Sequence, residues 1–162
     1  MPFSLPPKEK YLVGIISDTH GLMRAEALGA LSGAELIIHA GDIGKPEVLE
    51  ALRSVAPVVA VRGNNDRAAW AEGLAETETL EIGAVKIYLL HALQELSLDP
   101  AACGFNVVVS GHSHRPSVMR RDGVLYLNPG SAGPRRFKLP VTIARLTVHG
   151  RSCHARIVEL EV

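Results

Sequence analysis

The sequence has few of the features that mark secreted or membrane-bound proteins. Only two of its 162 residues are cysteine, Cys103 and Cys153, and their separation does not match a metal-ligand motif. No secretory signal accompanies them, so we expect two reduced thiols in a cytoplasmic protein. No apolar run approaches the roughly 20 residues of a membrane-spanning helix, so no membrane partner is expected.

The chain also has no excess of either charge and few aromatic residues. The 17 Lys and Arg residues balance 17 Asp and Glu residues, and aromatic residues make up 4% of the chain, with Trp70 as the one tryptophan. Long nucleic acids and anionic membranes are bound through basic surfaces, and single strands through aromatic platforms. We therefore expect no long nucleic acid as a partner. A phosphate-bearing ligand would need a local site.

The length and composition predict a single globular domain. A chain of 162 residues, 47% of them hydrophobic, is long enough to bury a substantial core. Residues 1–10 contain three prolines and no apolar central stretch. We expect them to be a flexible leader and not a signal peptide, with the domain over residues 11–162.

The first half of the chain alternates between apolar strands and helices. Strands are predicted over residues 11–17, 35–39 and 57–61, and helices over 24–31 and 46–54, the second with Pro46 in its first turn. Such a βαβαβ pattern predicts parallel pairing with right-handed crossovers. This half therefore indicates an α/β fold.

The second half is richer in hairpins. Turn residues separate three pairs of strands, at 77–82 and 85–90, 117–121 and 124–127, and 142–148 and 153–160. A short helical stretch is expected at 100–103, before an apolar strand at 106–110. The chain as a whole should combine a parallel sheet with added antiparallel hairpins.

Polar residues that could bind metal follow the ends of five predicted strands. Because ligands of open α/β sheets bind beyond the carboxyl ends of the strands, we expect these residues at one rim. Each motif alone is usually structural, as a turn or a helix cap, but five at corresponding positions favour a site. The motif residues are Asp18, His20, Asp42, Asn64, His91, His112 and His114.

The spacing and chemistry of these residues favour metal binding. Asp18 and His20 are two apart, as are His112 and His114, so in an extended backbone each pair would address one centre. Carboxylate, imidazole and amide ligands suit divalent ions such as Mn²⁺, Ni²⁺, Zn²⁺ or Fe²⁺. Seven ligands exceed the needs of one ion, and Asp42 is the natural bridge between two.

Other hydrolase chemistries and other histidines fit less well. The chain has neither the Gly-x-Ser-x-Gly elbow of serine hydrolases nor the His-Glu-x-x-His pattern of zinc proteases. His39 lies inside an apolar strand and is expected to be a buried structural residue. His149 and His154, near the last turn, are expected at the surface.

The order of the motifs resembles that of the calcineurin-like metallophosphoesterase superfamily over about residues 11–136. The motifs are, in order, Asp-x-His, Gly-Asp, Gly-Asn-x-Asp, a lone His and Gly-His-x-His. The short length and the segment Asn128–Ser131 resemble that superfamily's small bacterial and archaeal phosphodiesterase branch. The resemblance implies a two-sheet β-sandwich flanked by helices, in four α/β/β/α layers. It also implies two divalent metal ions, Mn²⁺ being the first choice.

The resemblance assigns the ligands to two metals. Asp18, His20 and His114 would bind one ion, Asn64, His91 and His112 would bind the other, and Asp42 would bridge them. Residues 128–131 would lie at the site rim. Arg135 and Arg136 could reach a substrate phosphate, although two solvated surface arginines are the favoured interpretation.

Three positions depart from patterns common in the superfamily. Asn65 stands where many members carry a histidine that helps to protonate the leaving group, which disfavours monoesters with poor leaving groups. Lys45 replaces the tyrosine of purple acid phosphatases, so an iron–tyrosinate site is not expected. Ala92 follows His91 where glycine is common, a small change.

The predicted activity is hydrolysis of a small phosphodiester by direct attack of a hydroxide generated at the two metals. Asn64 and His91 would also face the phosphate, and Asp66 would orient neighbouring groups. Two alternatives remain: a non-catalytic scaffold like the retromer subunit of this fold, or a nuclease or nucleotide phosphatase. The hairpin edges could support a homodimer.

Overall fold

The computed structural model describes residues 3–162. Its strands are β1 (Phe3–Ser4), β2 (Lys10–Ile16), β3 (Leu36–His39), β4 (Val58–Ala60), β5 (Thr77–Ile82), β6 (Val85–Leu90), β7 (Val107–Val109), β8 (Ser117–Arg121), β9 (Val124–Asn128), β10 (Thr142–His149) and β11 (Ser152–Glu159). The helices are α1 (Ala25–Ala30) and α2 (Pro46–Arg53), with short 3₁₀ helices η1 (Ala69–Ala71) and η2 (Leu93–Glu95).

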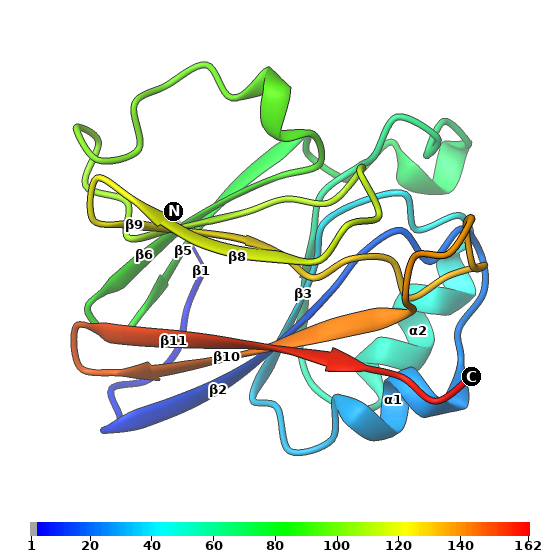
Figure 1. The fold of residues 1–162 in the computed structure, drawn as a ribbon, viewed down its shortest axis with the longest axis horizontal. Coiled ribbons are helices and arrows are strands. Elements are labelled where there is room, and N and C mark those ends of the chain that lie inside the picture. The colour runs from blue at the N-terminus through cyan, green and yellow to red at the C-terminus, as the bar shows by residue number, and fades with distance from the viewer. Residues whose placement is uncertain (1–2) are drawn as a thin grey trace.

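These strands form two sheets that pack face to face, as Figure 1 shows. One sheet has five strands in the order β11-β10-β2-β3-β4, with β2, β3 and β4 parallel. The other has six strands in the order β1-β5-β6-β7-β9-β8 and contains the parallel pairs β6–β7 and β7–β9. The predicted α/β sandwich, its parallel half and its three hairpins are confirmed.

The core is divided by the five-stranded sheet. Along β3, Leu36 and Ile38 face the other sheet, whereas Ile37 faces the helices. This alternation follows from the two-residue period of a strand. Helix α2 begins with Pro46, which suits a first turn because its missing N–H has no partner there. It packs Leu49 and its apolar neighbours against the sheet.

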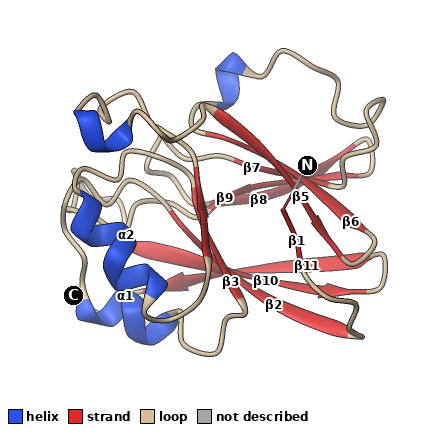
Figure 2. Cartoon of the chain, turned by 180° about the vertical axis from the view of Figure 1, so that it is seen from behind, coloured by secondary structure: helices blue, strands red, loops and turns tan. Residues whose placement is uncertain are grey.

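The outer layers differ from the expected four-layer arrangement in one respect. Helices α1 and α2 cover the five-stranded sheet (Figure 2). The other sheet is covered by the segment between β6 and β7, which packs Leu96, Leu98 and Phe105 on that face. This segment holds only the short helix η2, so the fourth layer is mostly loop.

Two local predictions need correction. The helix expected at residues 100–103 is wrong: the segment is a series of turns in which Phe105 N–H donates to the Pro100 carbonyl. Gly104 ends it with a φ of 81°. The expected leader is not uniformly flexible, because Phe3 and Ser4 pair with β5 and Lys10 begins β2. Residues 1 and 2 lie outside the described residues.

Within residues 3–162, no helix is long and apolar enough to cross a membrane.

Candidate metal centre

The loops that follow β2, β3, β4, β6 and β7 gather at one end of the sandwich, on the right in Figure 1. Main-chain hydrogen bonds join the first two loops, since Asp18 N–H donates to Gly41 O and His20 N–H to Asp42 O. A further bond, from Gly111 N–H to His91 O, joins the β6 and β7 loops. The five predicted motifs therefore lie together.

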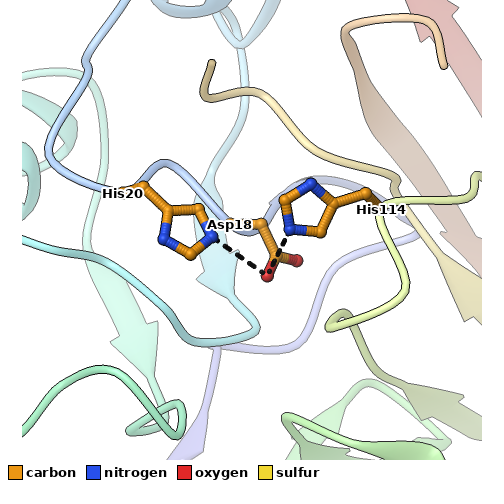
Figure 3. A group of neighbouring side chains, drawn as sticks. All are labelled: Asp18, His20 and His114. Carbon is orange, nitrogen blue, oxygen red and sulfur yellow. Dashed lines mark ion pairs between the residues drawn. The ribbon is translucent and has the colours of Figure 1, made fainter. Parts of the chain in front are cut away.

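The first group of metal-binding side chains is Asp18, His20 and His114, whose ligand atoms lie within 4.8 Å of one another. The Oδ1 atom of Asp18 is 3.8 Å from His20 Nε2 and 3.4 Å from His114 Nε2 (Figure 3). Asp18 is fully buried. Three ligand atoms thus converge on one point from two different sheets.

The second group is Asp42, His91 and His112, which meets the same distance criterion. His91 Nδ1 lies 2.7 Å from the carbonyl oxygen of Ala40. A carbonyl accepts and cannot donate, so Nδ1 carries the proton and Nε2 faces Asp42 Oδ2 at 3.2 Å. This fixed ring orientation is typical of metal-binding histidines.

Carboxylate oxygens lie between the two groups, and the Asp18 Oδ1 atom of the first group is 3.9 Å from His91 Nε2 of the second. Asp42 Oδ2 is 3.2 Å from His91 Nε2 in the second group and 3.8 Å from His20 Nε2 in the first. The two groups are therefore adjacent, as a bridging aspartate requires.

The donor set fits divalent cations. Asp18 Oδ1, His20 Nε2 and His91 Nε2 are buried and have no hydrogen-bond partner among the described residues. Buried polar atoms are costly to leave unpaired, and a cation at each group would satisfy them. The absence of thiolate from both groups agrees with the predicted preference for borderline or hard ions.

The charges of the groups are coupled. Burial raises the pKa of Asp42, but contact with His91 and the Asn65 N–H outweighs it and lowers the pKa to about 2. Burial likewise raises the pKa of Asp18, but the contact with His114 and the hydrogen bond from Ser17 outweigh it, so the pKa is lowered. Burial lowers the pKa of His91, but Asp42 and Asp18 raise it overall. Both carboxylates are therefore ionised at neutral pH.

Five residues of the two groups adopt the left-handed backbone conformation that favours glycine. Their φ angles are 56° for Asp18, 47° for His20, 55° for Asp42, 71° for His112 and 63° for His114. Such strain costs on the order of 1–3 kcal/mol per residue and persists at functional sites.

This conformation corrects one prediction about spacing. His112 and His114 were expected to address one centre, but His114 joins the first group and His112 the second. The expectation assumed an extended backbone, in which residues at i and i+2 point the same way. The backbone is not extended at either residue, since the φ angles of His112 and His114 are 71° and 63°, so the two side chains are free of that rule. As the family resemblance implied, His114 is grouped with Asp18 and His20, and His112 with His91.

Asn64, the remaining predicted ligand, is exposed at the mouth of the second group. With His91 and His112 it lines a cavity of about 290 Å³. Arg67 Nε donates to the Asn64 carbonyl at 3.0 Å and fixes its loop. Asp66 is buried and accepts N–H donors from Ile43, Gly44 and Gly63, which makes it an organiser of the loops.

Several supporting residues were not identified from the sequence. Ser17 donates to Asp18 Oδ2 at 2.7 Å, and Ser131 donates to the Asp18 carbonyl at 3.0 Å. Asn65 donates to Asp42 through both its backbone N–H and its side-chain amide, at 2.9 and 3.2 Å. Only the adjacency of Ser17 and Asn65 to the motifs could have suggested them.

The predictions for the segment Asn128–Ser131 and for Arg135 are confirmed. Asn128 donates to Gly111 O at 2.9 Å, so this segment braces the rim. Arg135 and Arg136 are exposed, and Arg135 donates to the carbonyls of Leu139 and Val162. They behave as surface arginines.

The histidines outside the motifs also match their predictions. His39 is fully buried, with its Nδ1 accepting from Gly41 N–H and its Nε2 next to Thr19 Oγ1 at 3.0 Å. His149 and His154 are exposed. Cys103 is exposed, Cys153 is buried, and both are free thiols.

The chain is similar in sequence to known phosphoesterases. Residues 11–151 match the calcineurin-like phosphoesterase superfamily domain. A probable metallophosphoesterase from Methanothermobacter thermautotrophicus is 34% identical over 158 residues, which is 91% of each chain. The phosphodiesterase YfcE of Escherichia coli K12 is 30% identical over 145 residues, 71% of this chain and 76% of its own.

The fold is also shared with solved structures. The structure of a novel archaeal phosphodiesterase superimposes with a TM-score of 0.75 at 24% identity, covering 91% of this chain and 99% of the other. Vacuolar protein sorting 29 from Cryptosporidium parvum gives a TM-score of 0.76 at 21% identity, covering 96% of this chain and 100% of the other.

Proposed function

This chain belongs to the calcineurin-like phosphoesterase superfamily, and from that premise we propose that it is a phosphodiesterase with a dinuclear metal centre. Asp18, His20 and His114 would hold one ion, and Asn64, His91 and His112 the other. Asp42 would bridge them. The observation that carries the proposal is the position of Asp42 Oδ2, within 3.8 Å of a histidine from each group.

Two divalent ions at these groups would supply nucleophilic water of lowered pKa and positive charge for the phosphoryl oxygens. The residues of the chain position the reaction. Asn64 and His91 line the cavity beside the second group, so they would contact the phosphate. Asp66 accepts hydrogen bonds from three loop N–H groups and would keep these loops in position. It would influence the reaction through the loops and not by contact with substrate.

The preference for diesters rests on Asn65. Its side-chain amide donates to Asp42 Oδ2 at 3.2 Å, and it carries no acidic proton for a leaving group. Hydrolysis of a monoester with a poor alcohol leaving group needs a general acid to protonate that alcohol. Such an acid typically raises the rate by about 10²–10⁴-fold. An activated phosphodiester needs little, which favours that substrate class.

We further propose Mn²⁺ as the working metal, with Ni²⁺, Zn²⁺ and Fe²⁺ as alternatives, and a small substrate in the cytoplasm. The chain carries no net charge that would favour a long nucleic acid. Strands β8 and β11 lie at sheet edges, where a second copy of the chain could pair to form a homodimer. Sedimentation of the purified chain measures that state directly.

The test of the dinuclear proposal is the variant Asp42→Asn. It keeps the shape of the bridging residue but removes its charge, so bound metal should fall below two ions per chain. Turnover of bis(p-nitrophenyl) phosphate should fall by about 100-fold or more, since even residues that only support ligands cost about 10–100-fold. Metal analysis and steady-state kinetics give both readouts.

Asp122→Asn is the matched control, because Asp122 also has a left-handed backbone, with φ 52°, but lies in the exposed β8–β9 turn. It should keep full metal content and activity. If Asp42→Asn retains two ions and normal turnover, the dinuclear proposal is wrong.

A further inference from the structure

Two cavities open beside His112 and differ in character. The first, of about 290 Å³, contains Asn64 and His91 of the metal centre. The second, of about 230 Å³, extends along the β8–β9 hairpin. His112 and Gln94 line both. The two cavities therefore diverge from a common wall at the second metal group.

The first cavity is polar and is lined by side chains of both positive and negative charge. Arg62 Nη2 pairs with Glu76 Oε1 at 3.1 Å, and the Glu76 side chain is 79% exposed. Exposed ion pairs contribute little to stability, so both groups are free to bond to a ligand instead. Glu95 and Gln94 add further acceptors. Because Glu76 and Glu95 both line the cavity, it would repel an anionic ligand group. The cavity therefore suits a neutral arm rich in hydroxyl groups.

The second cavity is largely apolar. Its walls include the side chains of Leu93, Met119, Tyr126 and Leu127. Leu93 and Met119 are 40% and 45% exposed, so a ligand there would cover apolar surface now in contact with water. A thioether and a phenol ring are both favourable neighbours for a flat aromatic ring.

We propose that the natural substrate is an unsymmetrical phosphodiester with one aromatic arm and one hydroxylated arm. A diester carries two alcohol groups on one phosphorus, and this geometry offers one cavity to each. The aromatic arm lies along Met119 and Tyr126, and the hydroxylated arm lies between Arg62 and Glu76. The inference rests on the proposed phosphodiesterase function and adds the substrate class.

Strand β8 supplies a matched pair of positions for testing the apolar cavity. Met119 lines the cavity, whereas its neighbour Val118 does not. The two are almost equally exposed, at 45% and 44%. The variants Met119→Ser and Val118→Ser therefore remove similar exposed apolar groups from one strand, and only the first changes the cavity.

The kinetic experiment uses three diesters with a common p-nitrophenyl arm, whose second arm is methyl, glyceryl or p-nitrophenyl. Met119→Ser should raise KM for all three about tenfold with little change in kcat, as expected for lost apolar binding. Val118→Ser should match the wild type. The wild type should prefer the glyceryl to the methyl ester about tenfold in kcat/KM, and Glu76→Gln should reduce that preference.

A binding experiment separates this inference from the proposed function. In Zn²⁺-loaded protein with ¹³C-labelled methionine methyl groups, phenylphosphonate should move the Met119 resonance and methylphosphonate should not. The Met119→Ser spectrum identifies that resonance.

The outcomes are distinct. If no diester is hydrolysed with Mn²⁺, Ni²⁺ or Zn²⁺, the proposed function fails, and the methionine spectra still decide whether the cavity takes an aromatic ring. If diesters are hydrolysed but Met119→Ser equals Val118→Ser, or if the resonance stays unmoved by phenylphosphonate, the substrate inference is overturned and the proposed function stands.

Discussion

At the scale of single residues, three side chains of the candidate metal groups, those of Asp18, Asp42 and His91, are held by neighbouring groups. Ser17 donates to Asp18, Asn65 donates to Asp42, and the Ala40 carbonyl accepts from His91. Such contacts fix the orientation of a ligand before an ion binds. The motifs name the candidate ligands, but the contacts of Asp42 and His91 come from loops that are distant in sequence, so the sequence does not reveal them.

His39 gives a prediction about pH. Burial lowers its pKa from the ordinary value of 6.5 to about 4, so the folded chain holds it neutral. The stability that the neutral ring contributes is present above pH 6.5 and is lost as the pH falls from 6.5 toward 4. Between pH 7 and pH 5 the loss should be roughly 2 kcal/mol.

Urea unfolding of the metal-free chain, with chelator present, measures this loss. The stability advantage of the wild type over His39→Asn should shrink by roughly 2 kcal/mol between pH 7 and pH 5. His149→Asn, at an exposed position, should show no comparable change. An advantage that stays constant over this range would contradict a neutral buried His39.

At the scale of elements, strands and hairpins were predicted best because their signals are local. The strands at 77–82, 85–90 and 117–121 match the structure, since each ends or begins at a hairpin turn, at Gly83–Ala84 or at Asp122–Gly123. Strand β1 was missed because two residues carry no periodicity, and it exists only through pairing with β5. The left-handed conformation of Asp18, His20, Asp42, His112 and His114 was also missed, because these residue types do not signal it as glycine does.

Gly63 shows how tightly the loops after the strands are packed, and Gly29 in α1 provides a comparison. A Cβ atom added to Gly63 would lie 2.2 Å from Asp42 N and Oδ1. Gly63→Ala should therefore displace Asp42 and lower metal content, and it should destabilise the chain. Gly29, in α1, has nothing within 4 Å of its added Cβ. Gly29→Ala should stabilise the chain by about 0.5–1 kcal/mol and leave metal content unchanged.

Metal analysis with thermal unfolding compares the two variants. Equal metal content in both would show that the contact between residue 63 and Asp42 does not matter. A loss of metal in Gly29→Ala would point instead to a general effect of alanine on the fold.

At the scale of the whole molecule, each metal group joins the two sheets. Asp18 and His20 follow β2 of the five-stranded sheet, whereas His114 follows β7 of the six-stranded sheet. Likewise Asp42 follows β3, and His91 and His112 follow β6 and β7. Two cations would thus link the sheets at one end of the sandwich and offset the strain of five left-handed residues.

Metal removal should therefore lower the stability of the whole chain and not only its activity. An ion that binds the folded state alone stabilises it by about 4 kcal/mol at a thousand times its Kd. For a chain of this size each kcal/mol is worth about 2–4 °C in Tm, so saturating Mn²⁺ should raise Tm by roughly 8–16 °C over chelated protein. His112→Ala, which leaves the first group intact, should show a smaller rise. The same Tm with Mn²⁺ and with chelator would mean that the sheets are held by their apolar core alone and that the groups do not retain the ion.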